Sequence, residues 1–144
     1  MFPIRTILQP TDFSEASAAA FRLACSLARD HGSRIIAVHV VAPPVAPYEV
    51  GWVVTEPEGY REELMVKLRS LRPTAPEVPV EYRLADGDPA AEVVRLARET
   101  PCDLIVMGTH GRTGLGRVLM GSVAERVLRT APCPVVTVKA PVKA

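Results

Sequence analysis

The stretch DLIVMGTHGRTGLGRVLMGSVAERVLRTAPCPVVTV, residues 103–138, carries two apolar runs with a helical pattern between them. The runs Asp103–Met107 and Val135–Val138 are short and rich in β-branched residues, which is typical of buried strands. One apolar stripe at helical spacing precedes the second run: Ala124, Val127, Leu128 and Ala131. A strand, a crossover helix and a second strand in this order predict a parallel β-α-β unit.

The same alternation extends over the rest of the chain. Three further strands are expected, at Ile4–Leu8, Arg34–Val41 and Val78–Leu84. Two more helices show apolar stripes, at Ala16, Ala20, Leu23, Ala24 and Leu27 and at Ala90, Val93, Val94 and Ala97, the second opened by Asp88-Pro89. The pattern predicts an α/β fold with a doubly wound, five-stranded parallel sheet in the order 3-2-1-4-5, as one domain over residues 1–144.

Composition narrows the classes of protein. A net charge of +1 gives no general attraction to nucleic acid or to an acidic membrane, so neither is expected as a partner. No apolar run approaches the ~20 residues that span a bilayer, and the first residues do not resemble a secretory signal. The widely spaced Cys25, Cys102 and Cys133 have no metal-binding spacing and are expected to be free thiols in a reducing cytoplasm.

The glycine-rich segment Gly108–Ser122 holds five of the nine glycines. Glycine lets a ligand approach main-chain N–H groups, and a helix N-terminus favours phosphate. Ser122 with Glu125 fits a capping box that opens the last helix, and Arg112 and Arg117 add positive charge. The segment therefore favours binding of a polyphosphate. The alternative is a mobile glycine-rich loop followed by an ordinary capped helix, which these residues fit as well. It matches neither GxxxxGK[ST] nor a GxGxxG between strand and helix.

The loop QPTDFS after the first strand is expected to face this segment across the switch point of the sheet. Asp12 is a candidate ligand contact, although Asp12 and Glu15 also fit a helix-capping pattern. His110 is a weaker candidate, and a Ser122–His110–Asp12 triad has no GxSxG elbow to support it. The region Ala42–Glu58, with four prolines, is either a functional loop or disordered.

Gly108-Thr-His-Gly111, nine residues and Gly121-Ser122 read as G-x2-G-x9-G-[ST], which resembles the nucleotide-binding motif of the ATP-binding branch of the universal stress protein family. PTDFSEAS, IIAVHVV and PCPVVTVK are similar to the same family, so the resemblance covers nearly the whole chain. It implies a Rossmann-like, adenine nucleotide alpha hydrolase-like fold and a homodimer joined through Val135–Val138. The resemblance also implies ATP as the ligand, with Mg²⁺ or Mn²⁺ bound mainly through the phosphates.

The resemblance assigns binding roles to residues near both loops. It implies phosphate contacts from Gly108, Gly111, Gly121, Ser122 and Val123, with Arg112 as a charge complement. It implies adenosine contacts from Pro10, Thr11, Asp12, Val40 and Met107. It assigns no catalytic or metal-ligating residue. The expected function is a cytoplasmic ATP-binding regulatory protein of the stress response. A genuine Mg²⁺-dependent ATPase or phosphotransferase and a nucleotide-free interaction module remain alternatives.

Overall fold

The computed structural model describes residues 2–42, 56–110 and 120–140. Strands and helices alternate along these ranges: β1 (Thr6–Pro10), α1 (Glu15–His31), β2 (Arg34–Val41), α2 (Tyr60–Arg69), β3 (Val80–Asp86), α3 (Pro89–Glu99), β4 (Leu104–Gly108), α4 (Ser122–Thr130) and β5 (Val135–Val138). All the strand pairs are parallel, and the order is β3-β2-β1-β4-β5. The predicted doubly wound sheet is confirmed.

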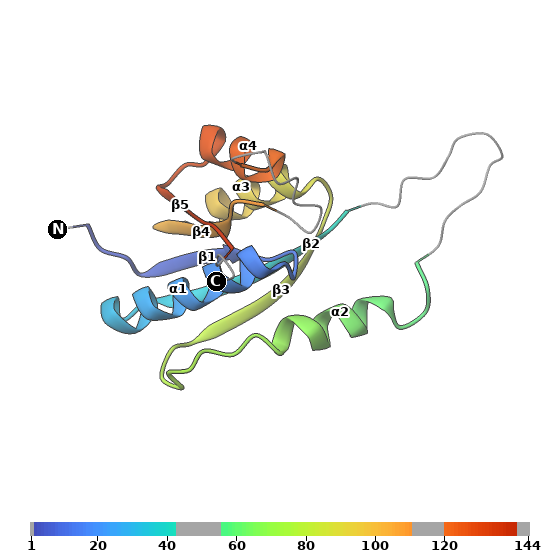
Figure 1. Ribbon diagram of the computed structural model, residues 1–144, viewed down its shortest axis with the longest axis horizontal. Helices are drawn as coiled ribbons and strands as arrows, with labels where there is room; N and C mark the ends of the chain where they lie inside the picture. The colour runs from blue at the N-terminus through green and yellow to red at the C-terminus, as the bar shows by residue number, and fades with distance from the viewer. Residues whose placement is uncertain (1, 43–55, 111–119, 141–144) are drawn as a thin grey trace.

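Two helical layers cover the sheet, with α1 and α2 on one face and α3 and α4 on the other (Figure 1). Successive residues of β1 divide between the layers. Ile7 belongs to the core cluster beneath α1 and α2, and Leu8 belongs to the cluster beneath α3 and α4. Because both faces are covered, the strands are apolar at successive positions, as a buried parallel sheet requires.

The strand boundaries differ from the sequence expectation in three places. β2 and β5 have the predicted bounds, whereas β1 and β3 each lie two residues later than expected and β4 lies one residue later. At β1 the pair Gln9-Pro10 resembles a loop, yet Pro10 is in register with Val38 of β2 and Gln9 is fully buried. A proline is accepted at the end of this central strand because of a local fork in the sheet.

That fork opens between β1 and β4. Their register ends at Leu8↔Ile105, although β1 continues beside β2 and β4 continues beside β5. Thr11 donates its N–H to the Val38 carbonyl of β2 at 2.8 Å. Successive residues of a strand direct their main-chain groups to opposite sides, so the nitrogen of Pro10 faces β4. Proline has no N–H to donate there. Its carbonyl oxygen instead accepts a hydrogen bond from the Gln9 side chain at 2.7 Å.

The starts of α1 and α4 correct two predictions. The N-cap of α1 is Ser14, whose Oγ accepts from the Ser17 N–H, so Asp12 does not cap this helix. The N-cap of α4 is Gly121, and Ser122 is already helical, so the proposed capping box is wrong. The chain enters the helix one residue earlier than the S-x-x-E pattern suggests. As a result the N-cap residue of α4 has no side chain that could cap the first N–H groups of the helix.

Two residues of the predicted apolar stripes are exposed. Leu23 of α1 is 36% exposed and Leu128 of α4 is 40% exposed. The buried side of α1 is instead lined mainly by alanine, with Phe21 and Cys25, so the helix packs close to the sheet. On each of these helices the predicted apolar stripe therefore included one residue that lies at the surface.

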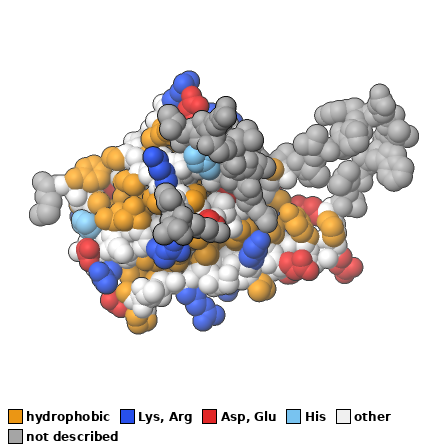
Figure 2. Space-filling model, viewed as in Figure 1, with side chains coloured by type: hydrophobic (Ala, Val, Ile, Leu, Met, Phe, Trp, Pro, Cys, Tyr) orange, Lys and Arg blue, Asp and Glu red, His pale blue; other side chains and the backbone are white. Residues whose placement is uncertain are grey.

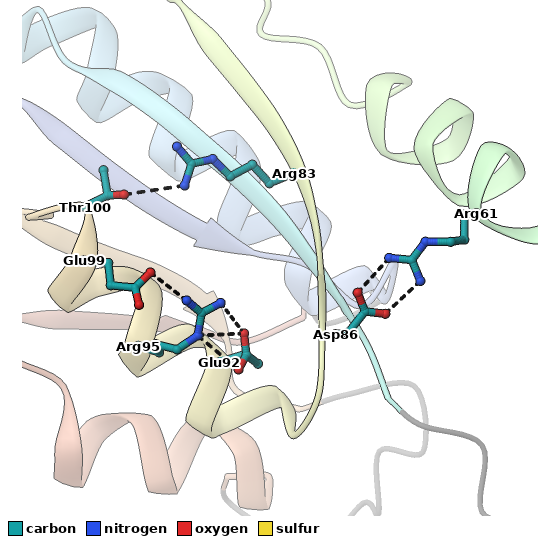
Figure 3. A network of polar contacts seen from close by, with 7 residues as sticks. All are labelled: Arg61, Arg83, Asp86, Glu92, Arg95, Glu99 and Thr100. Carbon is teal, nitrogen blue, oxygen red and sulfur yellow. Dashed lines mark hydrogen bonds and ion pairs between the residues drawn. The ribbon is translucent and has the colours of Figure 1, made fainter.

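The helix α2 is attached to the sheet by few groups. Leu68 is its one buried residue among those described. Arg61 forms two hydrogen bonds, of 2.7 and 2.8 Å, with the carboxylate of Asp86 at the end of β3 (Figure 3). On α3, Arg95 pairs with Glu92 and Glu99 in the same view. These exposed pairs orient helices more than they stabilise them.

The surface mixes acidic, basic and hydrophobic side chains in the view of Figure 2, in keeping with the net charge of +1. All three cysteines are free thiols, with Cys25 and Cys102 buried and Cys133 partly exposed. Burial raises the pKa of Cys25 and of Cys102 to about 11. In the described ranges no helix is long and apolar enough to cross a membrane. Most of the region Ala42–Glu58 lies outside the described residues.

Candidate functional site

A cleft of about 620 Å³ lies at the fork, along the carboxyl ends of the strands. Its volume falls within the range of small-molecule sites. The described residues that line it come from three places: the end of β1 and the start of α1, the end of β2, and the ends of β4 with the starts of α3 and α4. The sheet order reverses between β1 and β4, so this is the switch point where doubly wound proteins bind ligands.

Nine of the eleven predicted site residues line this one cleft: Pro10, Thr11, Asp12, Val40, Met107, Gly108, Gly121, Ser122 and Val123. The other two, Gly111 and Arg112, lie outside the described residues, as does Arg117. The two loops that the sequence expected to face each other therefore share a cavity.

The first side of the cleft is the turn from β1 into α1, and its own hydrogen bonds hold it. Thr11 is buried, and its Oγ1 accepts from the N–H of Phe13 at 3.1 Å. Asp12 Oδ1 accepts from the N–H of Ser14 at 2.9 Å. Asp12 thus orients the residue that caps α1, whereas the sequence had left a cap at Asp12 itself open as the alternative to a ligand contact.

Hydroxyl groups connect this turn to the segment after β4. Ser17 Oγ donates to the Ser14 carbonyl at 3.0 Å, so the Thr11 hydroxyl is the donor in its 3.1 Å bond with Ser17. Ser14 Oγ also lies 3.4 Å from the carbonyl oxygen of His110. The sequence analysis did not single out Ser14 or Ser17. The signal for both is S-x-x-S at residues 14–17, which fits an N-cap as well as D-x-x-E does.

The second side of the cleft is the segment after β4, and one hydrogen bond joins its first described residues to the start of α4. The Gly121 N–H donates to the Thr109 carbonyl at 2.6 Å, which joins the two ends of the glycine-rich segment. Thr109 is buried, and its N–H donates to Val138 at the end of β5. The start of α4 is therefore fixed against the ends of β4 and β5, beside the cleft.

The first N–H groups of α4 have no acceptor within the helix, as at every helix N-terminus. At α1 and α3 the side chains of Ser14 and Asp88 accept one such N–H. Gly121 has no side chain to do so, and Ser122 and Val123 line the cleft. The partial positive charge of this helix end therefore acts on the cleft.

Gly108 has a packing reason to lack a side chain. A Cβ on Gly108 would lie 2.9 Å from the carbonyl carbon and Cβ of Ala16 and from the nitrogen of Ser17. Such distances are too short for real side chains. Gly108 therefore lets the first turn of α1 lie directly on the end of β4, inside the fork.

One edge of the cleft carries an ion pair. Asp88 caps α3 through the N–H of Ala91 at 2.9 Å, and its carboxylate lies 2.9 Å from Arg126 of α4. The Ala91 N–H and the Arg126 guanidinium together hold the pKa of the Asp88 carboxyl below its usual range. The pair ties the starts of α3 and α4 together next to Pro89, which lines the cleft.

The chemistry of these groups suits binding. Hydroxyls, carbonyls and N–H groups line the polar side, and Val38, Val40, Met107 and Val93 line an apolar side. His110 Nδ1 lies 3.1 Å from Thr109 Oγ1. In the described ranges no three His, Cys, Asp or Glu side chains gather as a metal-binding group.

Fold and cleft together define a doubly wound α/β protein with a ligand-sized crevice at its switch point. The chain belongs to the universal stress protein family, whose sequence model matches residues 3–139. Universal stress protein MJ0531 from Methanocaldococcus jannaschii is 40% identical over 144 aligned residues, covering 96% of this chain and 84% of that protein.

Solved structures share the fold. The structure of hypothetical protein MJ0577 superposes with a TM-score of 0.79 at 26% identity, covering 98% of this chain and 99% of that one. A universal stress protein in complex with cAMP has a TM-score of 0.71 at 23% identity, covering 96% and 98%. The universal stress protein from Archaeoglobus fulgidus in complex with dAMP has a TM-score of 0.67 at 24% identity, covering 96% and 100%.

Proposed function

We propose that this protein binds an adenine nucleotide, with ATP as its main ligand, in the cleft between β1 and β4. The observation that carries the proposal is the start of α4, which lies at a ligand-sized cleft and whose N-cap, Gly121, has no side chain to accept from its first N–H groups. Such a helix end favours phosphate through its N–H donors and its dipole. The complexes of related folds with cAMP and dAMP support an adenine nucleotide as the class of ligand.

The cleft has two unlike ends, as a nucleotide does. Val40 and Met107 provide an apolar surface suited to the adenine ring, beside Pro10 and Thr11. Asp12 provides a carboxylate for hydroxyl or amine donors of the adenosine part. The phosphates would extend toward Gly121, Ser122 and Val123, with Gly111 and Arg112 from the segment outside the described residues.

A divalent cation fits this arrangement without dedicated ligands. Mg²⁺ commonly keeps several waters and binds through substrate phosphates. Mg²⁺ or Mn²⁺ would then enter with ATP and neutralise part of its charge. The chain itself would contribute the N–H groups of α4 and the hydroxyl of Ser122.

The cellular role that follows is regulatory. We propose a cytoplasmic protein of the stress response in which nucleotide occupancy shifts the population of conformations that partners recognise. Phosphoryl transfer needs a positioned nucleophile or base. Asp12, the acidic residue among the described residues that line the cleft, accepts from Ser14, and Asp88, next to the cleft, is engaged with Ala91 and Arg126. Hydrolysis is therefore expected to be slow or dependent on a partner.

Titration calorimetry with MgATP tests the binding proposal. Gly121→Val adds a branched side chain at the entrance of α4, and the backbone of Gly121 (φ −71°, ψ 160°) accepts valine. We expect this variant to lose at least tenfold in affinity. Ala131→Val is the matched control, because Ala131 is the extended residue at the other end of α4 (φ −64°, ψ 143°). No heat from the parent protein up to millimolar MgATP would contradict nucleotide binding and leave a nucleotide-free interaction module.

A single-turnover assay separates the binding protein from an enzyme. With excess protein over labelled MgATP, we expect ADP to form far more slowly than about one turnover per second, the lower end of typical enzyme rates. Turnover at that rate or faster would assign the chain to the ATPases or phosphotransferases.

We also propose a homodimer joined through β5. Within the described residues β5 pairs with β4 alone, so its outer edge is a row of main-chain donors and acceptors. Its four side chains are partly exposed. Size-exclusion chromatography with light scattering should give twice the 15.6 kDa chain mass. The carbonyls of Pro134 and Val138 accept from Ile105 and Thr109 on the β4 side, so Thr137 presents its N–H at the outer edge. Thr137→Pro should therefore give the monomer mass, because proline removes that edge donor. A monomeric parent would contradict the proposal.

A further inference from the structure

Phe13, in the turn that carries Asp12, has an unusual backbone conformation. Its φ is +65°, and it is the one non-glycine residue with a positive φ among those described. A bulky residue is disfavoured in this left-handed region, and such strain persists only when surrounding contacts hold it. Phe13 therefore identifies a place where neighbouring side chains determine the path of the β1–α1 turn.

Two side chains from other elements hold the Phe13 ring. The ring of His39 in β2 lies with its centroid 4.6 Å from that of Phe13, at an interplanar angle of 38°. The ammonium of Lys67 in α2 lies 4.5 Å from the centroid of Phe13, within the range of a cation–π interaction. We call these three residues the Phe13 stack.

His39 also forms a hydrogen bond with the backbone of the turn. Its Nδ1 lies 2.8 Å from the carbonyl oxygen of Thr11. A carbonyl oxygen can only accept, so Nδ1 carries the proton and donates. Thr11 is then held at its N–H by Val38 and at its carbonyl by His39. Its hydroxyl accepts from the N–H of Phe13.

Asp12 lies between these two restrained residues. Thr11 precedes it with three bonded groups, and Phe13 follows it with its ring in the Phe13 stack. Ala37, two residues before His39, packs in the cluster beneath α1 and α2, whereas Val38 packs beneath α3 and α4. By the alternation of side chains along a strand, the His39 ring lies on the α1 and α2 face. The apolar residues Val38, Val40 and Met107 of the cleft lie on the opposite face, and His39 itself contributes to the lining near the end of β2.

We propose that His39 and Phe13 are positioning residues for the nucleotide site, which hold Asp12 in its binding orientation from the face of the sheet that carries α1 and α2. Lys67 connects the same stack to α2. The inference rests on the proposed function for its effect on affinity, but its effect on the order of the turn does not depend on any ligand. Pre-organisation of this kind raises affinity because the turn loses little freedom on binding.

Three substitutions separate the parts of the stack. His39→Phe keeps a ring against Phe13 and removes the donor to Thr11. His39→Asn keeps an N–H at the place of Nδ1 and removes the ring. Phe13→Gly accepts the positive φ and removes the ring from the stack. Arg61→Ala is the control for a loosened α2, because it removes the bonds to Asp86 and keeps the side chains of Phe13, His39 and Lys67.

The first measurement needs no nucleotide. Amide hydrogen exchange of the Ser14 N–H, which is bonded to Asp12 Oδ1, reports the order of the turn. We expect exchange to be at least tenfold faster in His39→Phe and in Phe13→Gly, and close to the parent rate in His39→Asn and Arg61→Ala. Nitrogen chemical shifts of His39 should show the tautomer protonated at Nδ1.

The second measurement is the Kd for MgATP. The loss of the hydrogen bond between His39 and Thr11 corresponds to about a tenfold loss in affinity, so we expect that change in His39→Phe. Phe13→Gly should also lower the affinity, because glycine gives the turn more conformational freedom to lose on binding. His39→Asn should recover most of the affinity that His39→Phe loses. Parent-like exchange and affinity in His39→Phe would overturn the inference, as would equal losses in His39→Asn and His39→Phe. If the parent binds no nucleotide, the proposed function fails, and the exchange rates alone decide whether the stack orders the turn.

Discussion

The two sides of the cleft are built in opposite ways. The turn from β1 into α1 is closed upon itself, because Thr11, Asp12 and Ser14 accept or donate hydrogen bonds within it and Ser14 caps the helix. The segment after β4 leads to α4, whose N-cap is a glycine without a side chain. Both helices point their positive ends at the same region. Among the described residues, a side chain caps the first of these helix ends and none caps the second.

This difference assigns distinct tasks to the two sides. The turn from β1 into α1 is held in shape by its own hydrogen bonds, so its conformation does not depend on a ligand. At the start of α4, the proposed function assigns the first N–H groups to the phosphates of the ligand. Substitutions in the first side should therefore lower the stability of the protein together with its affinity, and substitutions at the start of α4 should lower affinity with little change in stability.

Gly108→Ala should have the largest effect, because Gly108 is where the two sides touch. The new Cβ would lie 2.9 Å from the backbone of Ala16 and Ser17, so the first turn of α1 must move. We expect the free energy of unfolding to fall by about 1–3 kcal/mol, as for other overpacked sites. MgATP affinity should fall with it. Urea denaturation and calorimetry measure the two effects.

Gly32→Ala provides the comparison for that variant. Gly32 lies at the other end of α1 with φ +67°, and an added Cβ meets nothing within 4 Å. Its cost is the backbone strain of alanine in the left-handed region, about 1 kcal/mol, without an effect on MgATP affinity. If Gly108→Ala binds MgATP as the parent does, the close contact with α1 does not matter for the cleft.

Ser14→Ala and Ser122→Ala form a matched pair with the next largest effect. Ser14 is an N-cap with a bonded side chain, so its loss should lower the free energy of unfolding by about 1 kcal/mol. Ser122 is the first helical residue and caps nothing, so its loss should stay within about 0.5 kcal/mol and act on MgATP affinity instead. Equal destabilisation by the two variants would contradict the contrast between the sides.

Sequence patterns predicted the sheet and both loops of the cleft. Apolar runs such as Arg34–Val41 sufficed to locate all five strands, because a strand covered on both faces is apolar at successive positions. The predicted bounds were correct at β2 and β5 and one or two residues early at the other three strands. The order 3-2-1-4-5 followed from the βα alternation, and nine predicted site residues lie at one cleft.

The local geometry of the turns was not predictable in this way. Two acceptors in PTDFSEAS fit the same capping spacing, and the choice of Ser14 over Asp12 depends on where the chain leaves β1. That exit in turn depends on Pro10 and on the fork beside β4, which is a tertiary feature. The contact of Gly108 with Ala16 and the approach of His39 to Thr11 likewise join residues far apart in sequence.

Acid should reveal the smallest difference between the helix starts. Hydrogen bonds from the Ala91 N–H and from Arg126 lower the pKa of Asp88 at the start of α3, and hydrogen bonds from Arg61 lower that of Asp86. A carboxyl whose pKa is lowered by folding stabilises the protein above its unfolded pKa of about 3.9, and this contribution is lost as pH falls through the folded value. We therefore expect the urea midpoint to decline below about pH 4, and to decline less in Asp88→Asn.

Because α4 has no acidic cap, exchange at Ala91 should accelerate in acid relative to exchange at Glu125, whose N–H donates to the Gly121 carbonyl. Equal acceleration at both amides would show that acid acts on the whole fold and not on the cap of α3.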